Sequence, residues 1–240
     1  MKMYIIIIIV CFASYFAKAQ DDIKEKYPFW VNITTKGGFI NSHLFCNNLD
    51  NDMDVEFGYF NPGYTVGGQV GVNWGGGFGG AIEVMYTGLT QEYHITNSLF
   101  SYDKSVKIGT LDKYLLLKSV GVKGSFLEIG VKFSKILDYS ETNSITVPYQ
   151  NSIDNFSDKE RVGILMGFGI NLFFTNVYSM NLGSRITYSI SDYMDGEHYV
   201  IDDGLHIIKN YTSYSTTNPV TVSLVLSMNF LISNGDIKPD

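Results

Sequence analysis

Regular alternation of apolar and polar residues over long segments is the feature that most constrains the fold of this chain. It is clearest between Val220 and Ile232, where every even-numbered residue is apolar and most odd-numbered residues are Thr, Ser or Asn. Successive side chains of a β-strand point to opposite faces, so this segment is predicted to be a strand with one apolar and one mostly polar face.

Eight segments follow this pattern or a weaker form of it. The predicted strands are Phe29–Phe39, Gly63–Trp74, Gly79–Tyr93, Lys113–Lys123, Phe126–Leu137, Arg161–Phe173, Tyr178–Ser191 and Val220–Ile232. Short turns follow the second, fourth and sixth strands, and longer loops follow the first, third, fifth and seventh. Most of the segments reach the ~9–11 residues that a tilted strand needs to cross a bilayer. Tight turns on one side and long loops on the other predict an all-β, eight-stranded antiparallel transmembrane barrel, with periplasmic turns and extracellular loops.

The connections and one strand leave points open. Loops are expected over about 40–62, from the end of the third strand to about Asp112, over 138–160 and over 192–218. The last of them could contain an extra hairpin or strand extension near Tyr199–Ile208. The consecutive residues Leu115, Leu116 and Leu117 obscure the alternation of the fourth strand, and a β-bulge is one interpretation. The first and last long loops could each hide a further pair of strands, so ten strands is the alternative count.

The N-terminus has the pattern of a secretory signal peptide. Lys2 precedes an apolar run from Tyr4 to Phe12, and Ala17-Lys18-Ala19 is an A-x-A cleavage signal. The run is too short for a membrane anchor of about 20 residues. The predicted organisation is therefore a signal peptide over 1–19, a periplasmic segment over 20–27, the barrel over 28–233 and a periplasmic tail over 234–240.

Composition excludes some classes of protein. Removal of Lys2 and Lys18 with the signal peptide would take the formal net charge from −7 to −9, which argues against nucleic-acid binding. Cys46 alone would remain, so the fold cannot depend on an internal disulfide. The 17 Tyr, 16 Phe and 24 Gly suit aromatic girdles and crowded strands, although a soluble β-sandwich could share them.

Three segments resemble the small outer-membrane β-barrel families of Gram-negative bacteria, the porin-family or PorT-like proteins. They are Gly67-Gly68-Gln69-Val70-Gly71, Gly79-Gly80-Ala81-Ile82-Glu83-Val84-Met85-Tyr86 and Lys113-Tyr114-Leu115-Leu116-Leu117. The last is similar to a family pattern Y-L-x-x-P, but Lys118 stands where the proline is usual. The resemblance covers nearly the whole mature chain and implies the barrel fold and an outer-membrane location. It also suggests a component of a secretion or envelope-assembly machine.

The alternation assigns five charged residues to the barrel interior: Lys36, Glu83, Glu128, Lys132 and Arg185. An eight-stranded barrel is only wide enough inside for side chains, and isolated buried charges are costly. These residues are therefore expected to pair and to close the barrel. The alternative is a gated path for ions lined by the same residues.

No segment predicts catalysis or a cofactor. The acidic stretch Asp50, Asp52, Asp54 and Glu56 begins like a calcium loop, but Val55 and Asn61 stand where such a loop needs Gly and Glu. The four histidines form no metal-binding motif, and the neighbours Ser42 and His43 are no catalytic arrangement by themselves. We expect a non-enzymatic scaffold that acts through its extracellular loops, with membrane lipid and other envelope proteins as partners. The alternatives are a narrow pore or a secretion component.

Overall fold

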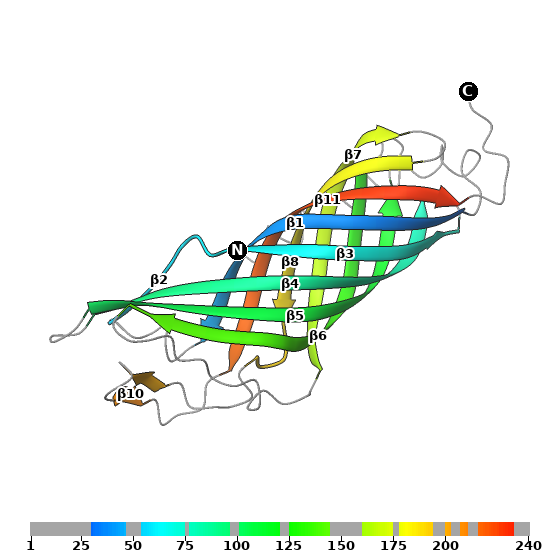
Figure 1. Ribbon diagram of the computed structural model, residues 1–240. Helices are drawn as coiled ribbons and strands as arrows, with labels where there is room; N and C mark the ends of the chain where they lie inside the picture. Colours follow the sequence, from blue (N-terminus) through cyan, green and yellow to red (C-terminus); the bar gives the residue numbers. More distant parts are fainter. Residues whose placement is uncertain are drawn as a thin grey trace, which may run out of the picture.

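A computed structural model describes the chain as an antiparallel β-barrel (Figure 1). It describes residues 30–46, 54–74, 77–96, 101–120, 125–144, 160–174, 178–193, 200–202, 207–210 and 216–232. The strands are β1 (Trp30–Cys46), β2 (Val55–Phe57), β3 (Pro62–Asn73), β4 (Phe78–Thr96), β5 (Ser101–Val120), β6 (Ser125–Asn143), β7 (Arg161–Phe174), β8 (Tyr178–Ser189), β9 (Val200–Asp202), β10 (Ile207–Asn210) and β11 (Thr217–Ile232). Within these ranges no helix is long and apolar enough to cross a membrane. The predicted signal peptide, the 20–27 segment and the 234–240 tail lie outside them.

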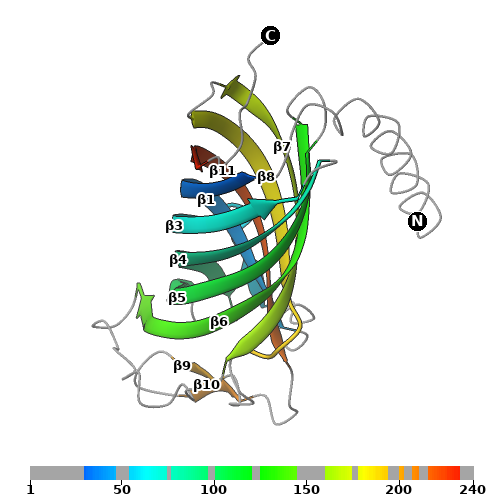
Figure 2. The same ribbon diagram turned by 90° about the vertical axis from the view of Figure 1, so that its right-hand side faces the viewer.

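Eight of the strands close into a ring in the order β1-β3-β4-β5-β6-β7-β8-β11, and β11 pairs back with β1 (Figure 2). The closing antiparallel pair runs in register from Val31↔Ile232 to Cys46↔Thr217. A closed ring leaves no free strand edge within the hydrocarbon, which is the condition for a sheet to span a membrane. The predicted eight-stranded antiparallel barrel is therefore confirmed.

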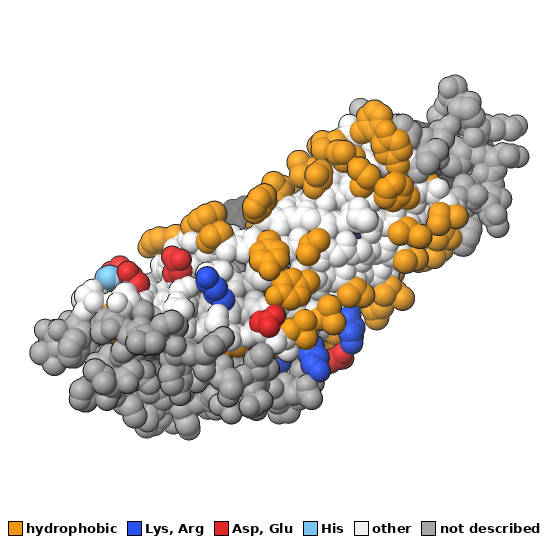
Figure 3. Space-filling view, in the orientation of Figure 1, with side chains coloured by type: hydrophobic (Ala, Val, Ile, Leu, Met, Phe, Trp, Pro, Cys, Tyr) orange, Lys and Arg blue, Asp and Glu red, His pale blue; other side chains and the backbone are white. Residues whose placement is uncertain are grey.

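The outer face of the ring carries an apolar belt over one half of the length of the barrel (Figure 3). In β11 the outward side chains of Val222, Leu224 and Leu226 are exposed, whereas Thr221 and Ser223 face the lumen. The same alternation continues around the ring through Ile33, Val66, Val70, Ile82, Val84, Leu115, Leu117, Ile129, Ile164, Met166, Phe168, Ile170 and Ile186. A belt of this kind matches lipid and not water, and together with the closed antiparallel ring it makes the protein an outer-membrane β-barrel.

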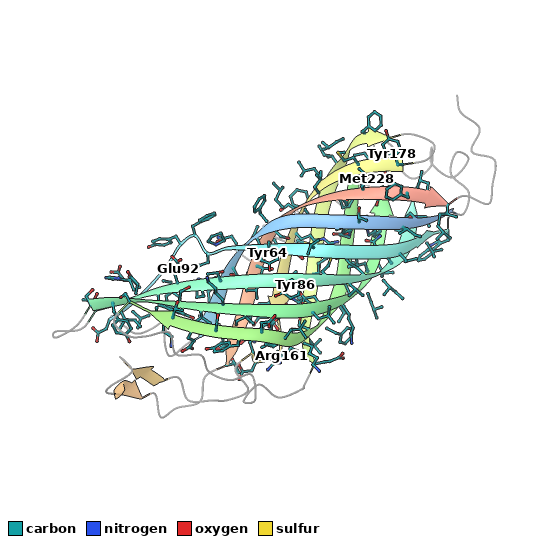
Figure 4. The ribbon with its side chains drawn as sticks, in the orientation of Figure 1. Tyr64, Tyr86, Glu92, Arg161, Tyr178 and Met228 are labelled. Carbon is teal, nitrogen blue, oxygen red and sulfur yellow. The ribbon has the colours of Figure 1, made fainter. Side chains whose placement is uncertain are left out.

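Aromatic side chains mark both borders of the belt (Figure 4). Tyr64 on β3 and Tyr86 on β4 lie with their ring centroids 6.0 Å apart toward the extracellular end. Phe173 on β7 and Tyr178 on β8 lie 5.6 Å apart at the periplasmic end. Such pairs at the headgroup level are typical of transmembrane barrels.

Three strands continue well beyond the apolar belt on the extracellular side. β4, β5 and β6 have 19, 20 and 19 residues, whereas β3 and β8 have 12 each. Residues 40–46, 94–96, 101–112 and 138–143, which were predicted to lie in loops, belong to strands. The loop predictions were wrong over these residues. We call the part made of residues 55–57, 89–96, 101–109 and 136–143 the projecting sheet.

The alternation reverses in the projecting sheet, which explains the error. Tyr102, Val106 and Ile108 of β5 point inward and are buried, while Ser101 and Asp103 point outward and are exposed. Inside the membrane the apolar face of each strand points outward; beyond it the apolar face points inward, as in a sheet with one face in water. These segments therefore lack the apolar outer face by which the membrane strands were identified.

An apolar core fills the projecting sheet. Its buried members are Ile40, Leu44, Val55, Leu89, Tyr93, Ile95, Tyr102, Val106, Ile108, Ile136, Tyr139 and Tyr193. β2 pairs with the end of β4, and the buried Asn61 joins this pair to β1. Asn61 Nδ2 donates to Ser42 O at 3.0 Å and to Gly58 O at 2.6 Å, and the Glu92 amide donates to Asn61 Oδ1 at 2.8 Å. One side chain thus holds three parts of the projecting sheet together.

β5 is regular through its three leucines, so the bulge interpretation there was wrong. Leu116 is buried inside the barrel, and Leu115 and Leu117 face outward. The register shift between β5 and β6 lies instead at Gly109 and Thr110. In the last long connection β9 pairs with β10, which confirms the expected extra hairpin.

Candidate functional site: an ionic cluster in the barrel lumen

The structure places all five charged residues that the alternation assigned to the interior inside the lumen. They come from four strands: Lys36 from β1, Glu83 from β4, Glu128 and Lys132 from β6, and Arg185 from β8. Their exposed fractions are 6%, 0%, 2%, 5% and 5%, respectively. Charges this deeply buried must be compensated by partners, so their contacts decide what the lumen can do.

Arg185 is the centre of the cluster. Its Nη1 and Nη2 donate to the two oxygens of Glu83 at 2.5 and 2.9 Å, and its Nε donates to Glu128 Oε1 at 2.5 Å. A guanidinium presents donors in a planar fork, which suits simultaneous contact with two carboxylates. Lys36 Nζ adds a contact of 2.5 Å to Glu83 Oε2. One arginine and one lysine thus neutralise the two glutamates from different sides.

Lys118 of β5 also belongs to the cluster, although the sequence reasoning missed it. Its Nζ lies 3.3 Å from Glu128 Oε2 and donates to Gln69 Oε1 at 2.7 Å. The leucine run at 115–117 hid the orientation of this strand. Counting alternate positions from Leu116 would have placed Lys118 inside. Lys36, Glu83, Lys118, Glu128 and Arg185 are called the ionic cluster below.

Lys132 is paired separately, and its partner was also missed. Lys132 Nζ lies 3.0 Å from Asp112 Oδ2, and the Tyr114 hydroxyl donates to the same oxygen at 3.3 Å. Asp112 was expected at the end of a loop, which is why it was not considered. The Tyr114 ring lies about equally far from Lys132 Nζ and Arg185 Cζ, at 6.0 and 5.9 Å from its centroid. The ring therefore links this pair to the ionic cluster.

A glycine provides the space for the central contact. A Cβ atom added at Gly167 on β7 would lie 2.8 Å from Glu128 Oε1 and 3.0 Å from Arg185 Cγ. Real Cβ atoms approach neighbours this closely very rarely, so any larger residue at position 167 would displace the Arg185–Glu128 pair. The inward glycines of this strand are thus explained by close packing inside a narrow barrel.

The inward residues of β1 pass through three kinds of surroundings along the barrel axis. Near the periplasm, Asn32 donates to Thr34 at 2.8 Å and Thr34 donates to Asn229 at 2.7 Å. Lys36 is the next inward residue and belongs to the ionic cluster. Ile40 and Leu44 follow, in the apolar core of the projecting sheet. Along β1, amide and hydroxyl groups, a charge and hydrocarbon therefore follow one another.

The acidic stretch that begins like a calcium loop is described only in part. Asp54 directly precedes β2 and Glu56 lies within it. Asp50 and Asp52 are outside the described residues. The side chain of Cys46 is also outside them. In the part of the chain that the structure describes, no group of three His, Cys, Asp or Glu residues could hold a metal ion.

No protein-family model matches the sequence, and no curated protein matches it. The solved structures that resemble the chain include the outer membrane protein OprG from Pseudomonas aeruginosa. It is 10% identical, with a TM-score of 0.44 over 86% of this chain and 97% of that chain. Neisserial surface protein A is 9% identical, with a TM-score of 0.37 over 84% and 96%.

A third similar structure is that of Ail, the attachment invasion locus protein of Yersinia pestis, in complex with the heparin analogue sucrose octasulfate. It is 9% identical, with a TM-score of 0.29 over 84% of this chain and 99% of that chain. These similarities are too distant to transfer a function. The porin-family or PorT-like assignment therefore stays a prediction, and the barrel rests on its own strand pairing.

Proposed function

We propose that the protein is a closed outer-membrane scaffold that conducts no ions and acts through its extracellular part. The observation that carries this proposal is the ion pair between Arg185 of β8 and Glu83 of β4. In the ring these two strands are separated by three strands on either side, so the pair crosses the full width of the lumen. Lys36 and Glu128 come from β1 and β6, the other two walls. A lumen bridged in both directions leaves no width for a hydrated ion.

The projecting sheet supports the scaffold part of the proposal. Its outer face carries exposed polar and charged side chains, among them Glu92, His94, Asp103, Lys107 and Thr142, above an apolar core that fixes their backbone. A rigid, polar surface outside the membrane suits binding of other envelope proteins. Membrane lipid is the partner of the apolar belt.

The alternatives make different electrical and biochemical predictions. If the lumen opened, its four cationic groups and three carboxylates, from the ionic cluster and the Asp112–Lys132 pair, would favour anions. A component of a secretion or envelope-assembly machine, as the PorT-like resemblance suggests, would co-purify with partner proteins from native membranes. Co-purification is compatible with a closed lumen, whereas conductance is not.

Recording from planar bilayers tests the closed state. The wild-type protein is expected to give no steady conductance after insertion. A double variant with Glu83→Ser and Arg185→Ser removes the bridge across the lumen together with both of its charges, and it should open a conducting path. Insertion is checked for both by heat-modifiable migration on gels. A steady, anion-selective wild-type conductance that changes in Glu128→Gln would contradict the proposal and favour the pore.

A further inference from the structure

The outer face of the projecting sheet carries three side chains in the order of a nucleophile, a base and an orienting acid. His94 on β4 lies directly opposite Asp103 on β5, and Ser101 is two pairs further along on the same face, opposite Thr96. His94 Nδ1 lies 2.6 Å from Asp103 Oδ1, and His94 Nε2 lies 3.2 Å from Ser101 Oγ. We call His94, Ser101 and Asp103 the surface triad.

The contacts determine the proton positions in the neutral imidazole. The Asp103 carboxylate can only accept a hydrogen bond, so His94 Nδ1 must carry the proton. His94 Nε2 then has a lone pair, and Ser101 Oγ donates its proton toward it. A serine that donates to an imidazole held by a carboxylate on its far nitrogen is the arrangement that makes a hydroxyl nucleophilic.

A fourth side chain can support the serine oxygen. Thr96 Oγ1 lies 3.5 Å from Ser101 Oγ, at the limit of a hydrogen bond. Because the only hydroxyl proton of Ser101 points to His94, Thr96 is the donor in this contact. This contact helps to hold the Ser101 hydroxyl in place beside His94.

The surface triad is open to water and lies outside the membrane. The side chains of His94 and Asp103 are 47% and 77% exposed, and Ser101 is also exposed. By contrast, Ser42, the neighbour of His43, is buried and donates to Thr90 O at 2.6 Å. A molecule approaching from outside the cell could therefore reach the triad without entering the barrel.

We propose that Ser101 is an activated nucleophile that takes acyl groups from carboxylic esters at the cell surface. Ser101 Oγ attacks the ester carbonyl carbon while its proton passes to His94 Nε2. The ester C–O bond then breaks, and the leaving alkoxide takes the proton from the imidazolium, which leaves an acyl-serine and an alcohol. Water repeats the two steps and releases the carboxylic acid. Asp103 keeps the imidazole oriented and stabilises its charged form.

The competing explanation is that these are only polar neighbours on an exposed sheet. Opposed side chains of adjacent strands often form such contacts and contribute slightly to pairing. This explanation, which fits a scaffold without chemistry, predicts no unusual reactivity for Ser101. The proposal predicts reactivity that depends on His94. The reaction of the serine itself therefore separates the two.

The experiment uses the refolded full-length barrel and a biotinylated fluorophosphonate. In the reaction Ser101 Oγ bonds to phosphorus, fluoride leaves and His94 accepts the hydroxyl proton. We expect covalent labelling mapped to Ser101 by mass spectrometry, absent in Ser101→Ala and slowed roughly tenfold or more in His94→Ala, because a positioned base contributes at least that much. Asp103→Asn should slow it by less. The same Ser101-dependence is expected for a burst of p-nitrophenolate from p-nitrophenyl acetate.

Ser105→Ala is the matched control. Ser105 lies on the same face of β5, but its opposite residue is Glu92 rather than a histidine. This variant should label like the wild type. Each variant is first shown to fold by heat-modifiable migration, so lost labelling is not lost structure. The proposal is overturned if wild type labels no faster than Ser101→Ala, or if His94→Ala labels at the wild-type rate.

Discussion

At the scale of single residues, Arg185 is the centre of the ionic cluster. It contacts two glutamates through three hydrogen bonds and lies against the Tyr114 ring, so it joins β4, β5, β6 and β8. Alternation alone placed Arg185, Glu83 and Glu128 in the interior, because each lies on a strand with clear periodicity. It could not pair them, since an ion pair across a barrel depends on which strands face one another.

Replacing Arg185 with Met should destabilise the barrel by about 3–5 kcal/mol, because Glu83 and Glu128 would stay buried without the three hydrogen bonds that the guanidinium donates to them. Urea unfolding in phospholipid vesicles measures the free energy. Lys107→Met is the control: Lys107 is exposed on the outer face of the projecting sheet, and its loss should cost less than about 0.5 kcal/mol. Equal unfolding midpoints for the two variants would show that the ionic cluster does not stabilise the fold.

The surface triad shows where residue-level prediction from sequence ends. His94 and Asp103 are nine positions apart, and nothing in that spacing indicates contact. They meet only because β4 and β5 pair in one particular register, as far as Thr96↔Ser101. A prediction that ended the third strand at Tyr93 and began the fourth at Lys113 could not bring them together.

At the scale of elements, the membrane strands were predictable and the projecting sheet was not. Both ends of β7 (Arg161–Phe174) could be predicted to within a residue, because the outer face of this strand is continuously apolar. Residues 101–109 also alternate, but the apolar side chains of Tyr102, Val106 and Ile108 face inward. Recognising them requires knowing where the membrane ends, and that position is a property of the assembled ring.

Asn61→Ala should loosen the projecting sheet without unfolding the barrel. The change leaves the buried Ser42 C=O and the partly buried Glu92 N–H without the Asn61 side chain as their partner, at a cost of about 1–3 kcal/mol. Hydrogen exchange at the Glu92 amide should accelerate roughly tenfold to a hundredfold, while exchange in β7 and β8 stays unchanged. Glu56→Gln, an exposed change in the adjacent β2, should leave the Glu92 amide protected. Equal exchange in both variants would contradict the role of Asn61.

At the scale of the whole molecule, the reversal of the alternation sets how deep the barrel lies. Leu226 on β11 is near the middle of the apolar belt, and an arginine there would face hydrocarbon. Leu226→Arg should cost about 2–4 kcal/mol in vesicles, whereas Thr142→Arg, on the outer face of the projecting sheet, should cost at most about 1 kcal/mol. The same unfolding titration measures both. A similar cost at both positions would place position 142 within the membrane as well.

This arrangement holds the projecting sheet at a constant height above the lipids. Outward movement would bring the apolar belt into water, and inward movement would bring Glu92 and Asp103 into hydrocarbon. From Tyr86 at the border of the belt to Thr96, β4 rises ten residues. At about 3.3 Å per residue and a tilt of about 40°, its tip stands roughly 25 Å clear of the bilayer. The sequence thus sets the height of the projecting sheet above the bilayer. A partner that binds the tip of this sheet is held at that distance from the membrane.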